Sequence, residues 1–224
     1  DKVDLTAAGS ITDGNAGAVN ITTRILDASS ATGIDLDTDV GSIAASVSAA
    51  GAIDIVESDT VTLTSVTTSN GSITINAGGT TTIDNGGAGN AVAAAAGGTI
   101  TINADGTASN LVVNDGVQSV AGIITLTADN DVSFDSDGDV ASTSGDIVVT
   151  ADQDDGGASS GLLTMTDGAV INAGSGTVDM DADGDISLSS VATTTEILIT
   201  SREGSILDNG NTGVDITAAT AALR

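Results

Sequence analysis

The side chains most able to do chemistry in this sequence are aspartates, which gather in two short clusters. Both clusters contain the pattern Asp-x-Asp-Gly-Asp, and alternate side chains of an extended strand point to the same side. Carboxylate oxygens are the ligands that Ca²⁺ prefers, at about 2.3–2.6 Å. The clusters are therefore candidate calcium sites, and no other cofactor is expected. The candidate ligands are Asp135, Asp137, Asp139, Asp181, Asp183 and Asp185.

Two familiar calcium loops do not fit these aspartates. The glycine does not stand where an EF-hand needs it, and no bidentate glutamate follows. The glycine-rich stretch 86–92 resembles a calcium-binding nonapeptide, but it occurs once and has Ala91 where a ligand aspartate should stand. Aspartate is also common in turns, because its short carboxylate accepts hydrogen bonds from nearby backbone N–H groups. Solvated turns are the simpler interpretation of the clusters, and calcium binding is the alternative.

The elements that must position these aspartates are short strands that recur along the chain. The clearest copy, residues 70–79, has an Asn-Gly turn, apolar residues at every second position and then two glycines. Such alternation between turn residues predicts a half-buried β-strand. Further copies begin with an apolar-x-apolar pair, and the pairs start at Val19, Ile34, Ile53, Ile73, Ile100, Ile124, Ile147, Leu163, Val178, Ile197 and Val214.

The spacing of these pairs predicts an all-β, single-stranded parallel β-helix, or β-solenoid, with about 20 residues per coil and roughly 11 coils. One coil cannot bury its own apolar face. Stacked coils can, because each strand pairs with its equivalent above and below, about 4.8 Å away. We therefore expect the first apolar residues of successive coils to form one internal column, with the acidic residues outside.

The composition fits a narrow core and excludes several classes of site. The chain has one aromatic residue, Phe134, and it lacks proline, cysteine and histidine. A wide globular core normally uses several aromatic side chains, whereas a solenoid interior fills with stacked aliphatic ones. The absence of cysteine excludes disulfides, thiol catalysis and zinc–thiolate sites. The regular β-branched alternation and a mean hydropathy of +0.26 argue against intrinsic disorder.

The charge balance limits the partners. The chain has 31 acidic and 4 basic residues, a net charge of −27. Nucleic acid and anionic membranes are not expected as partners, because binding to phosphates needs lysine and arginine. No stretch approaches 18 consecutive apolar residues, so no membrane insertion is expected.

Catalysis and ice binding are weaker alternatives. Asp154-Asp155 resembles the paired aspartates of polygalacturonases, but the histidine and the Arg-x-Lys pattern of that family are missing, so we do not expect an enzyme. Threonine at outward positions could form an ice-binding array, yet threonine is also a good strand residue, and aspartate or asparagine interrupts it. The threonines concerned are Thr60, Thr62, Thr64, Thr74, Thr80, Thr82, Thr99, Thr101 and Thr125.

The chain shows no composition shift that would mark a domain boundary. We expect residues 1–224 to be one continuous solenoid segment of a longer chain. Two stretches rich in glycine and small residues, near 84–98 and 151–161, are predicted to be outward loops.

The repeats resemble those of filamentous-haemagglutinin-type exoproteins, which are large bacterial surface adhesins. The resemblance lies in stretches such as residues 5–15, 204–211 and 214–218 and covers most of the chain. It implies a right-handed parallel β-helix, secretion to the bacterial cell surface and no enzymatic site in the rod.

From the repeat and the resemblance together we expect a structural rod segment that provides length, stiffness and a display surface. The alternative is a homotypic filament or surface-layer building block, stabilised by calcium. The expected partners are neighbouring repeats of the same chain, with homotypic assembly or a surface receptor or glycan as further candidates. The expected location is extracellular, at the bacterial cell surface.

Overall fold

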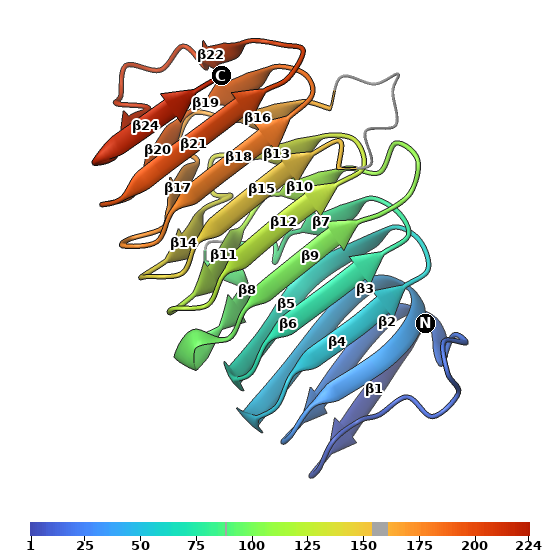
Figure 1. The fold of residues 1–224 in the computed structure, drawn as a ribbon. Coiled ribbons are helices and arrows are strands. Elements are labelled where there is room, and N and C mark those ends of the chain that lie inside the picture. The colour runs from blue at the N-terminus through green and yellow to red at the C-terminus, as the bar shows by residue number, and fades with distance from the viewer. Residues whose placement is uncertain (88, 154–160) are drawn as a thin grey trace.

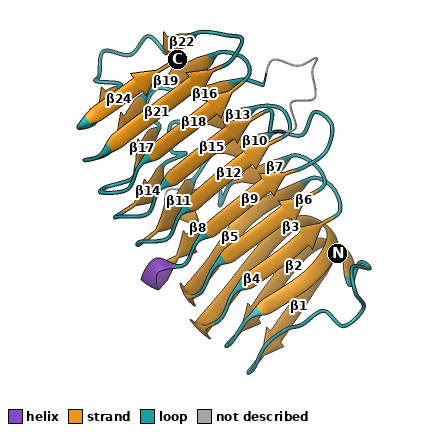
Figure 2. Cartoon of the chain, viewed as in Figure 1, coloured by secondary structure: helices purple, strands orange, loops and turns teal. Residues whose placement is uncertain are grey.

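The chain folds as a parallel β-solenoid of about nine turns, with roughly 23 residues per turn, in a computed structural model that describes residues 1–87, 89–153 and 161–224. Figure 1 shows the turns stacked in order from the N-terminus to the C-terminus, and Figure 2 shows that strands and turns form almost the whole molecule. Each strand pairs in parallel with strands of the neighbouring turns. The predicted all-β parallel solenoid is therefore confirmed. Among the described residues, no helix is long and apolar enough to cross a membrane.

Three faces, which we name A, B and C, wind around the core. Face A consists of the first part of β3 (Ile34–Ala50), then β4 (Ile53–Glu57), β6 (Ile73–Ala77), β9 (Ile100–Ala104), β12 (Ile124–Ala128), β15 (Ile147–Ala151), β18 (Val178–Ala182), β21 (Glu196–Ser201) and β24 (Thr220–Leu223). Face B consists of the first part of β5 (Val61–Asn70), then β7 (Thr81–Ile83), β10 (Leu111–Val113), β13 (Val132–Phe134), β16 (Leu163–Met165), β19 (Ile186–Leu188) and β22 (Ile206–Asp208). Face C consists of the last parts of β3 and β5, then β8 (Asn90–Ala94), β11 (Gly116–Ser119), β14 (Val140–Ser142), β17 (Val170–Asn172), β20 (Ser190–Ala192) and β23 (Ile216–Thr217).

In the first turns single long strands continue around the corners between faces, whereas the later turns have a separate short strand on each face. The strands β1 (Lys2–Ala7) and β2 (Ile21–Ser30) pair with each other, and β2 pairs with β3. β2, β3 and β5 each continue as one strand from one face onto the next, and the pairing of β3 with β5 shifts register between Ile43 and Ala44. A short 3₁₀ turn, η1 (Ala95–Gly97), follows β8 at the corner between faces C and A.

The core consists of apolar columns that run through successive turns. Equivalent residues of face A lie in register from β3 to β21, and all of them are at most 2% exposed. The column is Ile34, Ile53, Ile73, Ile100, Ile124, Ile147, Val178 and Ile197. The predicted internal column is thus confirmed. Burial of each such side chain contributes about 1.5–3 kcal/mol, and the column grows only if turns stack.

Glycines form a second column at the corner that precedes face A. A Cβ atom on Gly122 would lie far inside van der Waals contact with the carbonyl oxygen of Gly98, and Gly145 has the same relation to Gly122. The hydroxyl of a buried serine three residues earlier accepts a hydrogen bond from the glycine N–H, at 2.9 Å from Ser119 and 2.8 Å from Ser142. The recurrent glycine therefore serves close approach between neighbouring turns, because only a residue without Cβ fits there.

Three details of the sequence interpretation need correction. The turns number about nine rather than eleven, because an apolar-x-apolar pair occurs on more than one face. Leu163, for example, lies above Val132 on face B and not above Ile147. The predicted loop at 84–98 is shorter than expected, because Asn90–Ala94 forms β8, which pairs with β5 and β11. Of the other predicted loop, residues 154–160 lie outside the described residues.

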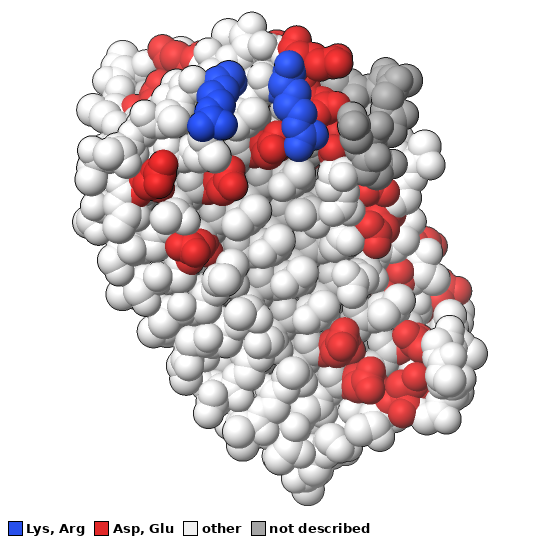
Figure 3. Space-filling view, viewed as in Figure 1, with Lys and Arg blue, Asp and Glu red and all other residues white. Residues whose placement is uncertain are grey.

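Most acidic side chains lie outside the core, as expected, but some do not. Figure 3 shows acidic side chains gathered near both ends of the visible face and along one edge, with an uncharged middle. Among the described residues, buried acidic side chains are Glu57, Asp115, Asp152 and Asp183. The expectation that all acids stay outside is therefore wrong at these positions.

Candidate functional site

The first predicted cluster occupies the corner between β13 and β14. The side chains of Asp135, Asp137 and Asp139 are all exposed. Asp135 accepts a hydrogen bond from the backbone N–H of Ser136 at 2.7 Å, and Asp139 accepts one from the N–H of Val170, in the next turn, at 2.9 Å. Asp137 and Asp139 line a surface hollow of about 210 Å³, which they share with Gly89, Asn90 and Gly116. The corner thus brings two carboxylates and an amide to one hollow.

The second predicted cluster spans the end of β18 and the turn after it, and it already has a cationic partner. Arg202, which lies one turn further along, donates hydrogen bonds to Asp181 and Asp183, each at 2.9 Å. The guanidinium lies against two of the three candidate carboxylates, and these contacts raise the pKa of Arg202. Asp185 instead accepts the backbone N–H of Ser205 at 2.7 Å. At this corner an arginine provides positive charge where the calcium hypothesis placed a metal ion.

Corner aspartates share one structural role. The carboxylates of Asp131 and Asp146 accept backbone N–H groups of Leu162 and Thr177 at 2.8 and 2.7 Å. The bonds of Asp139 and Asp185 follow the same pattern. In each case the donor lies in the next turn, so the aspartate satisfies a backbone N–H of the turn above it. This geometry agrees with the interpretation of aspartate as turn chemistry.

A third acidic group was not recognised in the sequence. Among the described residues, the one set of three acidic side chains whose ligand atoms lie within 4.8 Å of one another is Asp39, Glu57 and Asp59. Neither predicted triplet meets that condition. The signal that could have revealed it is the repeat itself, since strand β4 ends in Glu57 where the next five strands of face A end in alanine. Those alanines are Ala77, Ala104, Ala128, Ala151 and Ala182.

Glu57 is held inside the solenoid by hydrogen bonds. It is 1% exposed, and its carboxylate accepts the hydroxyl of Thr38 at 2.6 Å. It also accepts the backbone N–H groups of Val40 at 3.1 Å and Ser58 at 3.0 Å. Burial raises the pKa of Glu57, and these hydrogen bonds partly oppose the shift. The arrangement therefore accommodates a carboxylate next to Thr38 in a column whose following five members are alanines.

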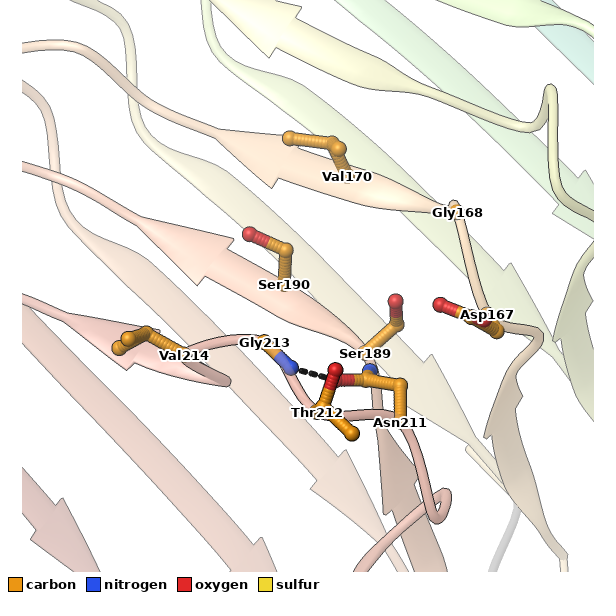
Figure 4. Close-up of a pocket in the computed structure, with 9 residues that line it drawn as sticks. All are labelled: Asp167, Gly168, Val170, Ser189, Ser190, Asn211, Thr212, Gly213 and Val214. Carbon is orange, nitrogen blue, oxygen red and sulfur yellow. Dashed lines mark hydrogen bonds between the residues drawn. The ribbon is translucent and has the colours of Figure 1, made fainter.

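A larger surface hollow lies near the C-terminal end of the solenoid (Figure 4). It measures about 280 Å³ and is lined by Asp167, Gly168, Val170, Ser189, Ser190, Asn211, Thr212, Gly213 and Val214. The side chain of Asn211 accepts the N–H of Gly213 at 2.6 Å, which holds the loop that forms one wall. Its lining contains one carboxylate, whereas acid–base hydrolysis of a glycosidic bond needs two. The hollow can donate and accept hydrogen bonds, but its lining provides no catalytic pair.

The remaining sequence candidates fall on different parts of the molecule. Asp154 and Asp155, which suggested a hydrolase, lie outside the described residues. Thr74, Thr101 and Thr125 do lie in register on the outer side of face A, but Val148 occupies the next position. The aligned threonine array therefore spans three turns.

Comparisons with protein-family models, with curated proteins and with solved structures found no match.

The calcium hypothesis stays a prediction for all six aspartates. Calorimetric titration with CaCl₂ at constant ionic strength would test it, with the double variant Asp137→Asn and Asp139→Asn as the comparison. Binding heat in the parent chain that the variant loses would support a site at the first corner. Absence of both heat and a melting-temperature shift would exclude it.

Proposed function

We propose that this chain is a structural rod segment of a large secreted bacterial surface adhesin, which provides length, stiffness and a surface for display. The observation that carries the proposal is the continuous column from Ile34 to Ile197, in which each turn packs on the one before. About nine turns at about 4.8 Å give a rod of about 43 Å. Bending such a rod would break hydrogen bonds and apolar contacts between turns, which is the physical source of its stiffness.

The surface supports a display role over a catalytic one. The outward positions of faces A and B carry mainly hydroxyl, amide and carboxylate groups, and the hollow in Figure 4 contains one carboxylate. The resemblance of the repeats to filamentous-haemagglutinin-type exoproteins supports secretion and a place at the cell surface. Corners vary in length without disturbing the columns, so they can present different loops on one scaffold.

A distance measurement tests the role as a rod. Thr62 and Ser187 lie on the outer side of face B, five ladder steps apart. Spin labels on Thr62→Cys and Ser187→Cys should give a backbone separation of about 24 Å. Deletion of residues 122–144, one whole turn, should shorten it to about 19 Å with the fold retained. Deletion of 122–133 should unfold the neighbouring turns, since it places Phe134 and the corner before face C where a face A strand should begin.

Surface labelling tests the proposed location. An antibody raised against this chain should label intact cells of the source organism without permeabilisation. Labelling that appears only after permeabilisation would contradict the extracellular proposal and leave the rod geometry unaffected.

A further inference from the structure

Face C is the broadest surface of this acidic protein on which the strand segments carry no charge. The face B strands from β5 to β19 are also uncharged, but most of them are only three residues long. The segments 44–50, 65–70, 90–94, 116–119, 140–142, 170–172 and 190–192 contain no aspartate, glutamate, lysine or arginine. The chain as a whole is 16% charged and has a net charge of −27. By contrast, face A carries outward acids at both ends, such as Asp35, Asp54 and Asp179.

We propose that face C is a self-association surface, at which a second copy of this chain packs in an antiparallel, two-fold arrangement. Two copies that approach through face A bring outward aspartates toward one another, and two that approach through face B bring together the aspartates that flank its short strands, such as Asp131 and Asp135. Two copies that approach through face C oppose serine, threonine, alanine and amide side chains. Face C is therefore the widest uncharged strand surface on which two chains of charge −27 can meet.

The surface shape of face C is complementary to itself under a two-fold rotation. A hollow of about 400 Å³ is lined by residues of β3, β5 and β8, among them Ser46, Thr67 and Ala93. Val120 stands beside the hollow in the next turn, where its N–H donates to the carbonyl oxygen of Ala94, and its side chain is 49% exposed. A two-fold axis near Ala93 places Val120 of each copy over the hollow of the other, so one operation fills both hollows.

The area of face C sets the strength of the contact. Seven segments of about five residues cover roughly 16 Å by 33 Å, or about 500 Å² on each copy and about 1,000 Å² in total. That total is at the lower limit for a specific interface, so we expect a weak dimer that forms at micromolar or higher concentrations. Small outward side chains permit close packing of the two sheets, about 10 Å apart.

Sedimentation velocity of the purified chain tests the inference directly. The dimer fraction should rise with protein concentration and should also rise between about 0.05 M and about 0.5 M NaCl, because salt screens the remaining repulsion. Val120→Glu should weaken association about tenfold or more, since it places like charges at the interface. Val56→Glu is the matched control, because Val56 is 48% exposed on face A, and it should associate like the parent.

Cross-linking identifies the surface. The chain has no cysteine, so Ala93→Cys introduces a single thiol near the proposed axis, and it should form a disulfide-linked dimer under mild oxidation. Thr101→Cys, at a comparable outward position on face A, should form one much more slowly. A monomer at all concentrations, equal loss of association in both glutamate variants, or equal cross-linking of both thiols would overturn the inference. None of these outcomes would change the spin-label distances, so failure here is distinguishable from failure of the rod proposal.

Discussion

Individual residues in the interior columns decide how well each turn packs on the next. Most column positions are aliphatic, and the polar exceptions include Glu57 and Thr81, which are both buried. Glu57 has hydrogen-bond partners for its carboxylate, whereas the hydroxyl of Thr81 has none among the described residues. We therefore expect that removal of the unpaired Thr81 hydroxyl stabilises the fold, whereas removal of the hydrogen-bonded Glu57 carboxyl group does not.

Replacement of Thr81 by valine should stabilise the chain. Thr81 lies in register between Val61 and Leu111, so its column neighbours on both sides are apolar. Valine has nearly the same shape without the unpaired hydroxyl, and we expect a gain of about 1 kcal/mol in the free energy of unfolding. Urea denaturation measures it. The neighbouring outward variant Thr82→Val should change stability much less, and destabilisation by Thr81→Val would show that its hydroxyl has a partner.

The stability of the chain should decrease as the pH rises above the ordinary pKa of glutamate. Burial raises the pKa of Glu57, Asp54 and Asp179, so the folded state binds more protons than the unfolded state between the ordinary and the raised values. Stability is then fully present below the unfolded pKa, about 4.5 for Glu57, and is lost as the pH rises through the folded pKa. Melting temperatures measured from pH 4.5 to 7 should decline.

The variant Glu57→Gln separates the contribution of this residue from that of the others. Its melting temperature should vary less with pH than that of the parent, because one of the groups with a raised pKa is removed. Asp167→Asn removes one charge from an exposed turn and should leave the slope nearly unchanged. An identical slope in Glu57→Gln and the parent would show that Glu57 does not contribute.

At the scale of elements, the corner before face A decides whether turns can stack. The glycine column brings backbone atoms of successive turns closer than any side chain would permit, and buried hydroxyls such as that of Ser119 satisfy the glycine N–H groups. The same strands would form with alanine at these corners, because the alternation of apolar residues does not depend on the glycine. What alanine would prevent is the close contact of one corner with the next.

Replacement of Gly122 by alanine should therefore destabilise the solenoid by about 2–3 kcal/mol, because the new Cβ atom collides with the backbone at Gly98. Thermal or urea unfolding followed by circular dichroism measures the loss. Gly14→Ala is the control, since nothing lies within 4 Å of a Cβ atom at that position. Equal effects of the two substitutions would show that the corner can relax.

At the scale of the whole molecule, apolar stacking works against a large net charge. The stack gains stability from every neighbouring pair of turns, while 31 acidic residues against 4 basic ones repel one another along the rod. Ion pairs that offset this repulsion are sparse among the described residues and involve Lys2 and Arg202. Inter-turn hydrogen bonds to aspartate carboxylates hold several acids in place without neutralising them.

The melting temperature should consequently rise with NaCl. Screening shortens the range of repulsion from about 30 Å at 0.01 M salt to about 3 Å at 1 M, which lowers the energy of the compact state relative to the unfolded chain. Circular dichroism melts across this range measure the effect. A melting temperature that stays constant or falls would show that repulsion between the acids does not limit stability.

The sequence by itself determined the class of fold and the identity of the inward residues. Period-two alternation requires that one side of each strand is buried, and stacking is the way in which so short a strand can bury it, so Ile53, Ile73, Ile100 and Ile124 had to lie above one another. The sequence did not determine the number of turns or which face a strand joins. Leu163 has the same local pattern as Ile147, and only the path of the chain around the corners separates their faces.

Tertiary structure alone decided the surroundings of the charged residues. The carboxylates of Asp181 and Asp183 contact Arg202 because β18 and β21 are neighbouring strands in the stack. Asp39, Glu57 and Asp59 come together because β4 pairs with β3 and Asp59 lies in the turn after β4. The uncharged surface of face C likewise emerges only when segments about 23 residues apart are aligned. The physical reason is that hydrophobic alternation is local in sequence, whereas the partner of a polar or charged group depends on which turns the fold brings into contact.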